Sequence, residues 1–121
     1  MLKTIDALIE RLSESGVPFT RDMWVDEGNE MADQDYGIVE ISGPPVPLWG
    51  DGELVCQTIQ GNVILYVLGG EETRVKQIQD ILRDEGISFS LAGMDYVQSE
   101  NKNRWTWRFE METYLLEDDD A

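Results

Sequence analysis

The strongest indication of fold class in this sequence of 121 residues is the segment Glu53–Leu68, ELVCQTIQGNVILYVL. Its β-branched and aromatic residues favour a strand. Gln60–Gly61–Asn62 in its middle fits either a bulge in one long strand or a hairpin turn, and we predict the long, bent strand. Val63–Leu68 is apolar on both faces, which predicts a central strand covered by helices.

Two amphipathic helices are predicted, one before and one after this strand. In residues 2–15, and from Glu71 to about Glu85, apolar side chains recur every three or four positions with charged side chains between them. Gly16 and Gly86 supply the expected C-terminal stops. Each helix therefore has one apolar face that can pack on a sheet.

Further extended segments are predicted, and the last has the most regular pattern. They cover residues 18–25, 36–42, 87–91 with a short extended piece at 94–98, and 104–115. In the last segment one face carries Trp105, Trp107, Phe109 and Met111, and the charged residues fall on the other. This alternation is typical of a strand with one buried face.

Residues 43–47, GPPVP, separate two of the predicted strands. Because proline lacks an amide donor and fixes φ, we expect a rigid connector loop there. The resulting order, α–β–β–β–α–β–β, predicts an α+β fold, a mostly antiparallel mixed sheet of about four or five strands with two helices packed on it. We expect one domain at residues 1–116, followed by an acidic tail at 117–121.

Acidic residues dominate the charge of the chain. Twenty-five Asp and Glu residues against nine Lys and Arg residues leave a formal net charge of −16. Nucleic-acid affinity comes mainly from Lys and Arg side chains that displace counterions, and anionic membranes repel an acidic surface. We therefore expect no direct nucleic-acid affinity and no membrane partner. The longest apolar run, Val63–Leu68, is also too short to span a bilayer.

The inventory of reactive residues predicts a protein that is not an enzyme and holds no cofactor or metal. The chain has no histidine and a single cysteine, which excludes histidine-containing triads, histidine metal ligands and an internal disulfide. Cys56 lies in an apolar strand, and we expect a small buried residue rather than a nucleophile. Residues 26–35 carry five acids, but their spacing does not match an EF-hand, so we expect a solvated loop.

The same inventory bears on the compartment. A chain without disulfides fits a reducing compartment. Residues 1–6 meet charged side chains before any apolar run, so we expect no signal peptide there.

Aromatic residues in predicted loops are typical of interaction surfaces. Trp24 and Trp49 are the two most prominent cases. For Trp49, a lid that folds over the edge of the sheet is an equally good interpretation.

The order of the elements and several short segments resemble the tail terminator proteins of long-tailed phages and prophages, also called tail-completion or head–tail joining proteins. The resemblance spans roughly residues 2–114. The segments that carry it are Val17–Pro18–Phe19, Tyr36–Ser42, Trp49–Gly50–Asp51–Gly52, Ile64–Leu65–Tyr66–Val67, the helix Val75–Leu82 with Asp84–Glu85–Gly86–Ile87 after it, Tyr96–Val97–Gln98–Ser99–Glu100, and Trp105–Thr106–Trp107–Arg108–Phe109. The prolines Pro44–Pro45 are not part of it.

This resemblance implies a structural, non-enzymatic protein of the virion. Such subunits form a ring, usually of six copies, that caps the finished tail tube, stops its polymerisation and joins the tail to the head. The implied partners are other copies of the chain, the tail tube protein and a head-completion or connector protein. The implied location is the head–tail interface of the virion, after synthesis in the cytoplasm of the bacterial host.

The acidic composition suits a ring, because a lumen lined by carboxylates would let DNA pass without binding it. On this hypothesis Trp24, Asp26, Glu27, Trp49 and Asp51 are candidates for contacts between subunits or with the tube.

The alternative is an acidic binding module. A DNA mimic that blocks a DNA-binding enzyme, or an inhibitor, immunity-type or antitoxin-like partner of a basic enzyme, would have the same composition. The acids of this chain are spread over loops and both helices, without a regular double row. A ring protein should associate with itself or bind a tube protein, whereas a mimic should bind a basic enzyme with an affinity that falls steeply in salt.

Overall fold

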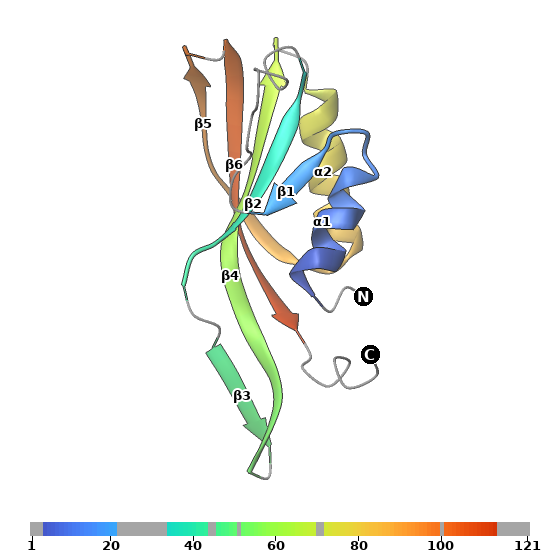
Figure 1. Ribbon diagram of the computed structural model, residues 1–121, viewed down its shortest axis with the longest axis vertical. Helices are drawn as coiled ribbons and strands as arrows, with labels where there is room; N and C mark the ends of the chain where they lie inside the picture. The colour runs from blue at the N-terminus through green and yellow to red at the C-terminus, as the bar shows by residue number, and fades with distance from the viewer. Residues whose placement is uncertain are drawn as a thin grey trace.

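A computed structural model describes residues 4–21, 34–43, 46–50, 52–69, 72–99 and 101–113, with the backbone alone for residues 48–50 and 53–55. Its elements are α1 (Ile5–Ser13), β1 (Phe19–Arg21), β2 (Tyr36–Ile41), β3 (Val46–Gly50), β4 (Glu53–Leu68), α2 (Thr73–Asp84), β5 (Ser88–Val97) and β6 (Lys102–Thr113). The strands form one six-stranded sheet in the order β1-β2-β4-β6-β5, with β3 paired to the far end of β4 (Figure 1). Only the β1–β2 pair is parallel.

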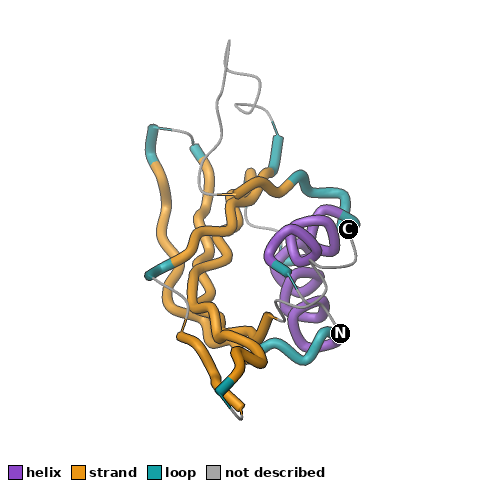
Figure 2. Tube along the Cα trace, turned by 60° about the horizontal axis from the view of Figure 1, so that its bottom comes forward, coloured by secondary structure: helices purple, strands orange, loops and turns teal. Residues whose placement is uncertain are grey.

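Both helices lie on the same face of the sheet, and the opposite face carries no helix among the described residues (Figure 2). The hydroxyl of Thr4 caps α1 by accepting a hydrogen bond from the Ala7 amide at 3.0 Å. Gly16 follows the helix with φ of +96°, a conformation that glycine adopts without strain. The predicted α+β class, with a mostly antiparallel sheet and two helices packed on it, is confirmed.

The predicted long, bent strand is confirmed as β4, a continuous strand of 16 residues. Gly61 lies where β4 leaves β2, opposite Ile41 of β2 and Phe109 of β6. A Cβ atom at Gly61 would lie 2.1 Å from the carbonyl oxygen of Glu40, so only glycine permits this close approach of the two backbones. On the N-terminal side of Gly61, β4 pairs with β3, and the two strands project from the body of the domain (Figure 1).

The core lies between the helices and the inner face of the sheet. Leu8 of α1, Ile78 of α2, Val63 of β4 and Trp107 of β6 are all fully buried. The alternation predicted for the last strand is confirmed, because its Trp and Phe side chains point into this core while Arg108 and its charged neighbours lie on the opposite face.

Several details differ from the sequence predictions. The prediction of a connector loop at residues 43–47 is wrong for its last two residues, because β3 begins at Val46. Pro47 is tolerated because β3 is an edge strand, one side of which needs no amide donor. The sheet therefore has six strands rather than four or five. Residues 22–25, 114 and 115, which were predicted to extend two strands, lie outside the described residues.

Two further predictions are corrected in the second half of the chain. The extended pieces at 87–91 and 94–98 form one strand, β5, because a bulge between Leu91 and Gly93 lets pairing with β6 continue across both. The second half of β4 is central as predicted, but the helices among the described residues cover only one of its faces. Leu65 is fully buried on the helix side, whereas Ile64 and Tyr66 are half-buried on the other side.

Neither described helix has the length and hydropathy that crossing a membrane requires.

Candidate functional site

The interaction residues predicted from the sequence are not brought together by the described part of the structure. Trp24, Asp26, Glu27 and Asp51 lie outside the described residues. The backbone of Trp49 belongs to β3 and pairs with Leu54 of β4, and its side chain is not among those described. These five assignments stay predictions.

The face of the sheet turned away from the helices, here called the polar face, carries two cross-strand rows of polar side chains. The first row runs Glu40, Asn62, Arg108 and Ser90 across β2, β4, β6 and β5. The second row runs Gln60, Glu110 and Ser88 across β4, β6 and β5, and it ends beside Ser42, the amide of which donates to the carbonyl of Gln60 at 2.8 Å.

Amide side chains engage both acids of these rows. The Asn62 side-chain amide donates to the Glu40 carboxylate at 2.9 Å. The Gln60 side-chain amide donates to the Glu110 carboxylate at 2.8 Å. One oxygen of each carboxylate therefore accepts a hydrogen bond from a side chain of β4.

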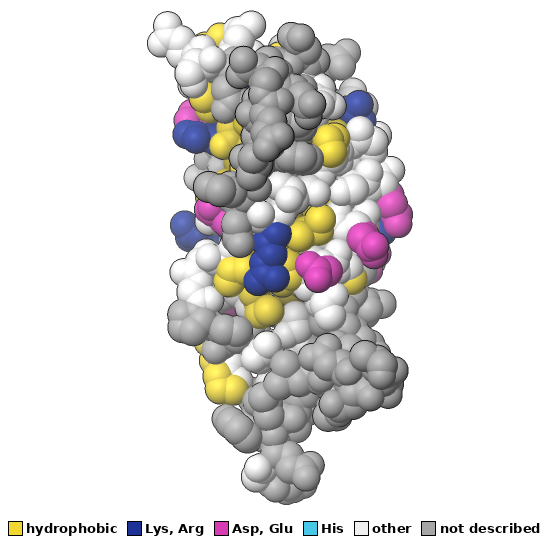
Figure 3. Space-filling model, viewed as in Figure 1, with side chains coloured by type: hydrophobic (Ala, Val, Ile, Leu, Met, Phe, Trp, Pro, Cys, Tyr) yellow, Lys and Arg dark blue, Asp and Glu magenta, His cyan; other side chains and the backbone are white. Residues whose placement is uncertain are grey.

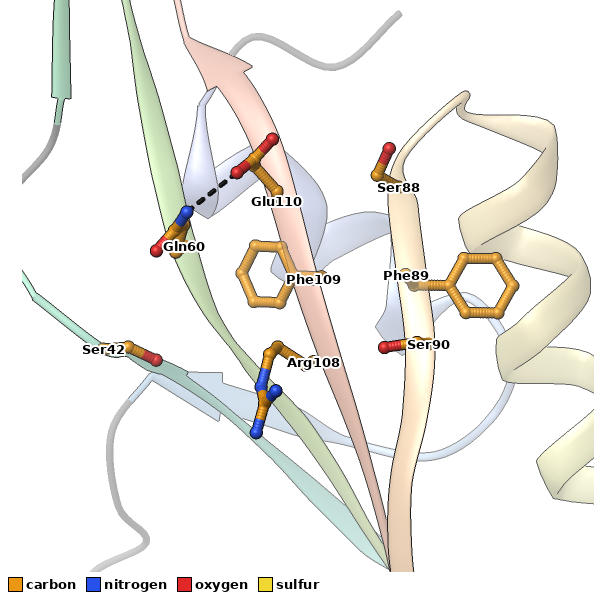
Figure 4. A pocket seen from close by; sticks show the side chains of 8 residues that line it. All are labelled: Ser42, Gln60, Ser88, Phe89, Ser90, Arg108, Phe109 and Glu110. Carbon is orange, nitrogen blue, oxygen red and sulfur yellow. Dashed lines mark hydrogen bonds between the residues drawn. The ribbon is translucent and has the colours of Figure 1, made fainter.

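A shallow recess of about 450 Å³ lies over these rows, and we call it the Arg108 recess. It is lined by Ser42, Gln60, Ser88, Phe89, Ser90, Arg108, Phe109 and Glu110. In Figure 4 the guanidinium of Arg108 extends from β6 between Ser42 and Ser90, the hydroxyls of which are turned toward the middle of the recess. The recess thus combines the exposed cation of Arg108 with neutral hydrogen-bonding groups and with one carboxylate, that of Glu110, which accepts a hydrogen bond from Gln60.

The neighbouring part of the polar face is occupied by internal contacts. Arg104 of β6 binds Asp95 of β5 through two hydrogen bonds, at 3.0 and 2.5 Å. The guanidinium of Arg104 holds the pKa of Asp95 below its usual range. The rings of Tyr36 and Tyr66 stack at 4.6 Å, and the ammonium of the buried Lys102 lies 4.5 Å from the centre of the Tyr36 ring.

The second candidate surface is the β5 edge, defined as the side of β5 that is not paired with β6. Because the bulge adds one residue, Leu91, Met94 and Tyr96 all point to the helix side of the sheet. They are nevertheless 49%, 54% and 54% exposed, since the helices do not reach this end of the sheet. Asp95 is the one charged residue of β5, and Arg104 neutralises it.

Cys56 is buried as predicted, at 2% exposure. Its sulfur lies 3.7 Å from the carboxylate of Glu112. Burial, together with the negative charge of Glu112, raises the pKa of the Cys56 thiol. The thiol is therefore held protonated, which is the reverse of what nucleophilic catalysis needs.

Sequence reasoning found the alternation of β6 but missed both surfaces. The exposed charges of β6 were visible as a period of two, yet their partners on β2, β4 and β5 depend on strand register. The β5 edge could have been suspected from its composition, because Ser88–Val97 contains a single charged residue in a chain of net charge −16.

No protein-family model and no curated protein sequence matches this chain.

Proposed function

We propose that this chain is a structural subunit of a long-tailed phage, a tail terminator that forms a ring on the tail tube and joins the tail to the head. The proposal combines the sequence resemblance, which implies six copies, with the surface of the fold. Its partners would be further copies of the chain, the tail tube protein and a head-completion or connector protein.

The β5 edge is the observation that carries this proposal. An edge strand presents unpaired backbone donors and acceptors, and soluble proteins normally protect it with lysines, prolines or inward-pointing charges. β5 runs for ten residues without lysine or proline, and its one acid is neutralised by Arg104. The bulge between Leu91 and Gly93 is the one protective device that the described part of this edge carries. Exposed Leu91, Met94 and Tyr96 add an apolar strip beside it. Such an edge supports association through backbone pairing between strands.

The charge of the chain makes the β5 edge the favourable place for contact between copies. Two molecules of net charge −16 repel each other over most of their surface. Contact along a strand of low charge avoids this repulsion and removes apolar side chains from water. A contact between two different surfaces of the same chain is also the type that can close a ring.

The projecting hairpin of β3 and β4 supplies a second surface for assembly. It extends beyond the helices and the rest of the sheet (Figure 1), and Val46 on it is 57% exposed. We assign this hairpin to contacts with the tube, and the β5 edge to contacts between subunits.

The acidic binding module is less well supported by the described acids. A mimic needs carboxylates that are free to replace phosphates, but Asp80, Glu85 and Asp95 lie in ion pairs with arginine or lysine. Glu40 and Glu110 are engaged by amides. In Figure 3 the described acidic, basic and hydrophobic side chains are interspersed on the face shown rather than gathered into one acidic field.

Electron microscopy of the purified protein in negative stain tests the proposal. We expect ring-shaped particles with a central opening and six-fold symmetry. A preparation without ring-shaped particles at high protein concentration, combined with salt-sensitive retention on a basic DNA-binding enzyme, would favour the acidic binding module instead.

A further inference from the structure

Arg108 differs from most cations of the described structure in having no carboxylate beside its charge. Ion pairs with Asp or Glu side chains hold Arg11, Arg74, Lys76, Arg83 and Arg104. The exposed guanidinium of Arg108 makes no hydrogen bond or ion pair with any residue that the structure describes. In a chain with 25 acids and nine bases, a cation left in this state is unexpected.

Neither of the two carboxylates nearest to Arg108 in the strand register pairs with it. Glu40 shares its cross-strand row and Glu110 lies two residues along β6, but Asn62 and Gln60 engage these carboxylates. The guanidinium therefore keeps its donors for a group outside the molecule.

The donors around Arg108 match a carboxylate. A guanidinium presents parallel N–H groups that bind a carboxylate in a bidentate manner. The hydroxyls of Ser42 and Ser90, which line the same recess, can donate further hydrogen bonds to its oxygens. A phosphate fits less well, because Glu40 and Glu110 would repel its second negative charge.

We propose that the Arg108 recess binds an aspartate or glutamate side chain of a neighbouring copy of this chain, an inference that rests on the proposed function. Charge complementarity favours this occupant. Each neighbouring copy carries 25 acids in its sequence, and a contact between molecules of net charge −16 gains most from an unneutralised cation.

The position of the recess beside the β5 edge supports the same occupant. Ser90 belongs to β5 and pairs with Arg108 across β6. A strand added to the β5 edge would continue this row, two strand spacings or about 10 Å from the backbone of Arg108. In Figure 4 the Arg108 side chain leans toward Ser42, so it would meet a glutamate of the added strand over Ser90 after a change of its rotamer toward β5.

Light scattering behind size-exclusion chromatography tests this inference on the full chain and two matched variants. Arg108→Gln removes the cation, and Arg83→Gln on the exposed side of α2 makes the same change of charge away from the recess. We expect Arg108→Gln to raise the protein concentration at half-assembly at least tenfold, whereas Arg83→Gln shifts it less than twofold. Thermal unfolding of Arg108→Gln, measured at a protein concentration at which the wild type is also monomeric, should match that of the wild type, because Arg108 has no partner within the described structure.

The outcomes separate this inference from the proposed function. If the wild type assembles and both variants assemble equally well, the role of Arg108 is refuted and the ring proposal stands. If the wild type stays monomeric at every concentration, both are contradicted. A selective loss of assembly in Arg108→Gln, with an unchanged unfolding temperature, supports the carboxylate contact.

Discussion

Replacing Gly61 with alanine should destabilise the sheet at the point where β4 leaves β2. The new Cβ would lie 2.1 Å from the carbonyl oxygen of Glu40 and 3.0 Å from a ring carbon of Phe109. Non-bonded heavy atoms prefer separations of about 3.5 Å, so the two backbones must move apart by roughly 1 Å. Because the Glu40 oxygen belongs to the backbone, no side-chain rotation can relieve the contact.

The expected loss of stability follows from what this separation breaks. The hydrogen bond from the Ser42 amide to the Gln60 carbonyl, now 2.8 Å, would lengthen beyond the hydrogen-bonding range and lose about 1 kcal/mol. Crowding against Phe109 adds about 1–3 kcal/mol of overpacking. The lower chain entropy of alanine in the unfolded state returns about 0.5 kcal/mol. The net loss is about 1.5–3.5 kcal/mol, which corresponds to a fall in Tm of roughly 10 °C.

Urea unfolding followed by tryptophan fluorescence measures this difference, since the fully buried Trp107 reports on the core. Gly93→Ala is the matched control, because a Cβ at Gly93 meets no atom within 4 Å and its φ is not positive. We expect this control to unfold within about 1 kcal/mol of the wild type. Equal stability of Gly61→Ala and Gly93→Ala at the same protein concentration would refute the close approach of β2 and β4.

Two more predictions concern ionisable groups. Arg104 lowers the pKa of Asp95 in the folded state, so the pair contributes stability above the unfolded pKa of about 3.9 and loses it as pH falls through the folded pKa. Asp95→Asn should therefore unfold more easily than the wild type at pH 7, with the difference closing below about pH 4; a difference independent of pH would contradict the pairing. Cys56, with its raised pKa and 2% exposure, should react with a thiol reagent more than about tenfold more slowly in the native protein than in urea, and equal rates would show that it is accessible.

Local patterns were sufficient for most elements of the fold. The period-two alternation in β6 and the helical periodicity of α1 and α2 each identified a buried face, because burial in this fold follows one side of each element. Gly61 marked the bend of β4, although its reason, the carbonyl of Glu40, is a contact between strands far apart in the sequence.

Features that depend on neighbours could not be predicted in this way. The strand β3 exists because the projecting part of β4 offers it an edge, which overrides the local preference of residues 43–47 for a loop. The bulge in β5 joins two segments that look separate in the sequence. The Arg108 recess depends on the register of β2, β4, β5 and β6, and a shift of one residue would turn Arg108 into the core.

The most direct test of the central claim is the molar mass of the chain in solution, measured by light scattering over a range of protein concentrations. Each chain has a mass of 13.8 kDa, so a ring of six copies would weigh about 83 kDa. We compare the wild type with Met94→Lys, which places a lysine on the β5 edge, and with Val46→Lys, which makes the same change at a similarly exposed position on the projecting hairpin.

A ring of six copies joined at the β5 edge predicts a mass near 83 kDa for the wild type and for Val46→Lys, and a monomer of 13.8 kDa for Met94→Lys. A wild-type protein that stays at 13.8 kDa at every concentration, or a Met94→Lys variant that assembles as fully as Val46→Lys, would contradict it.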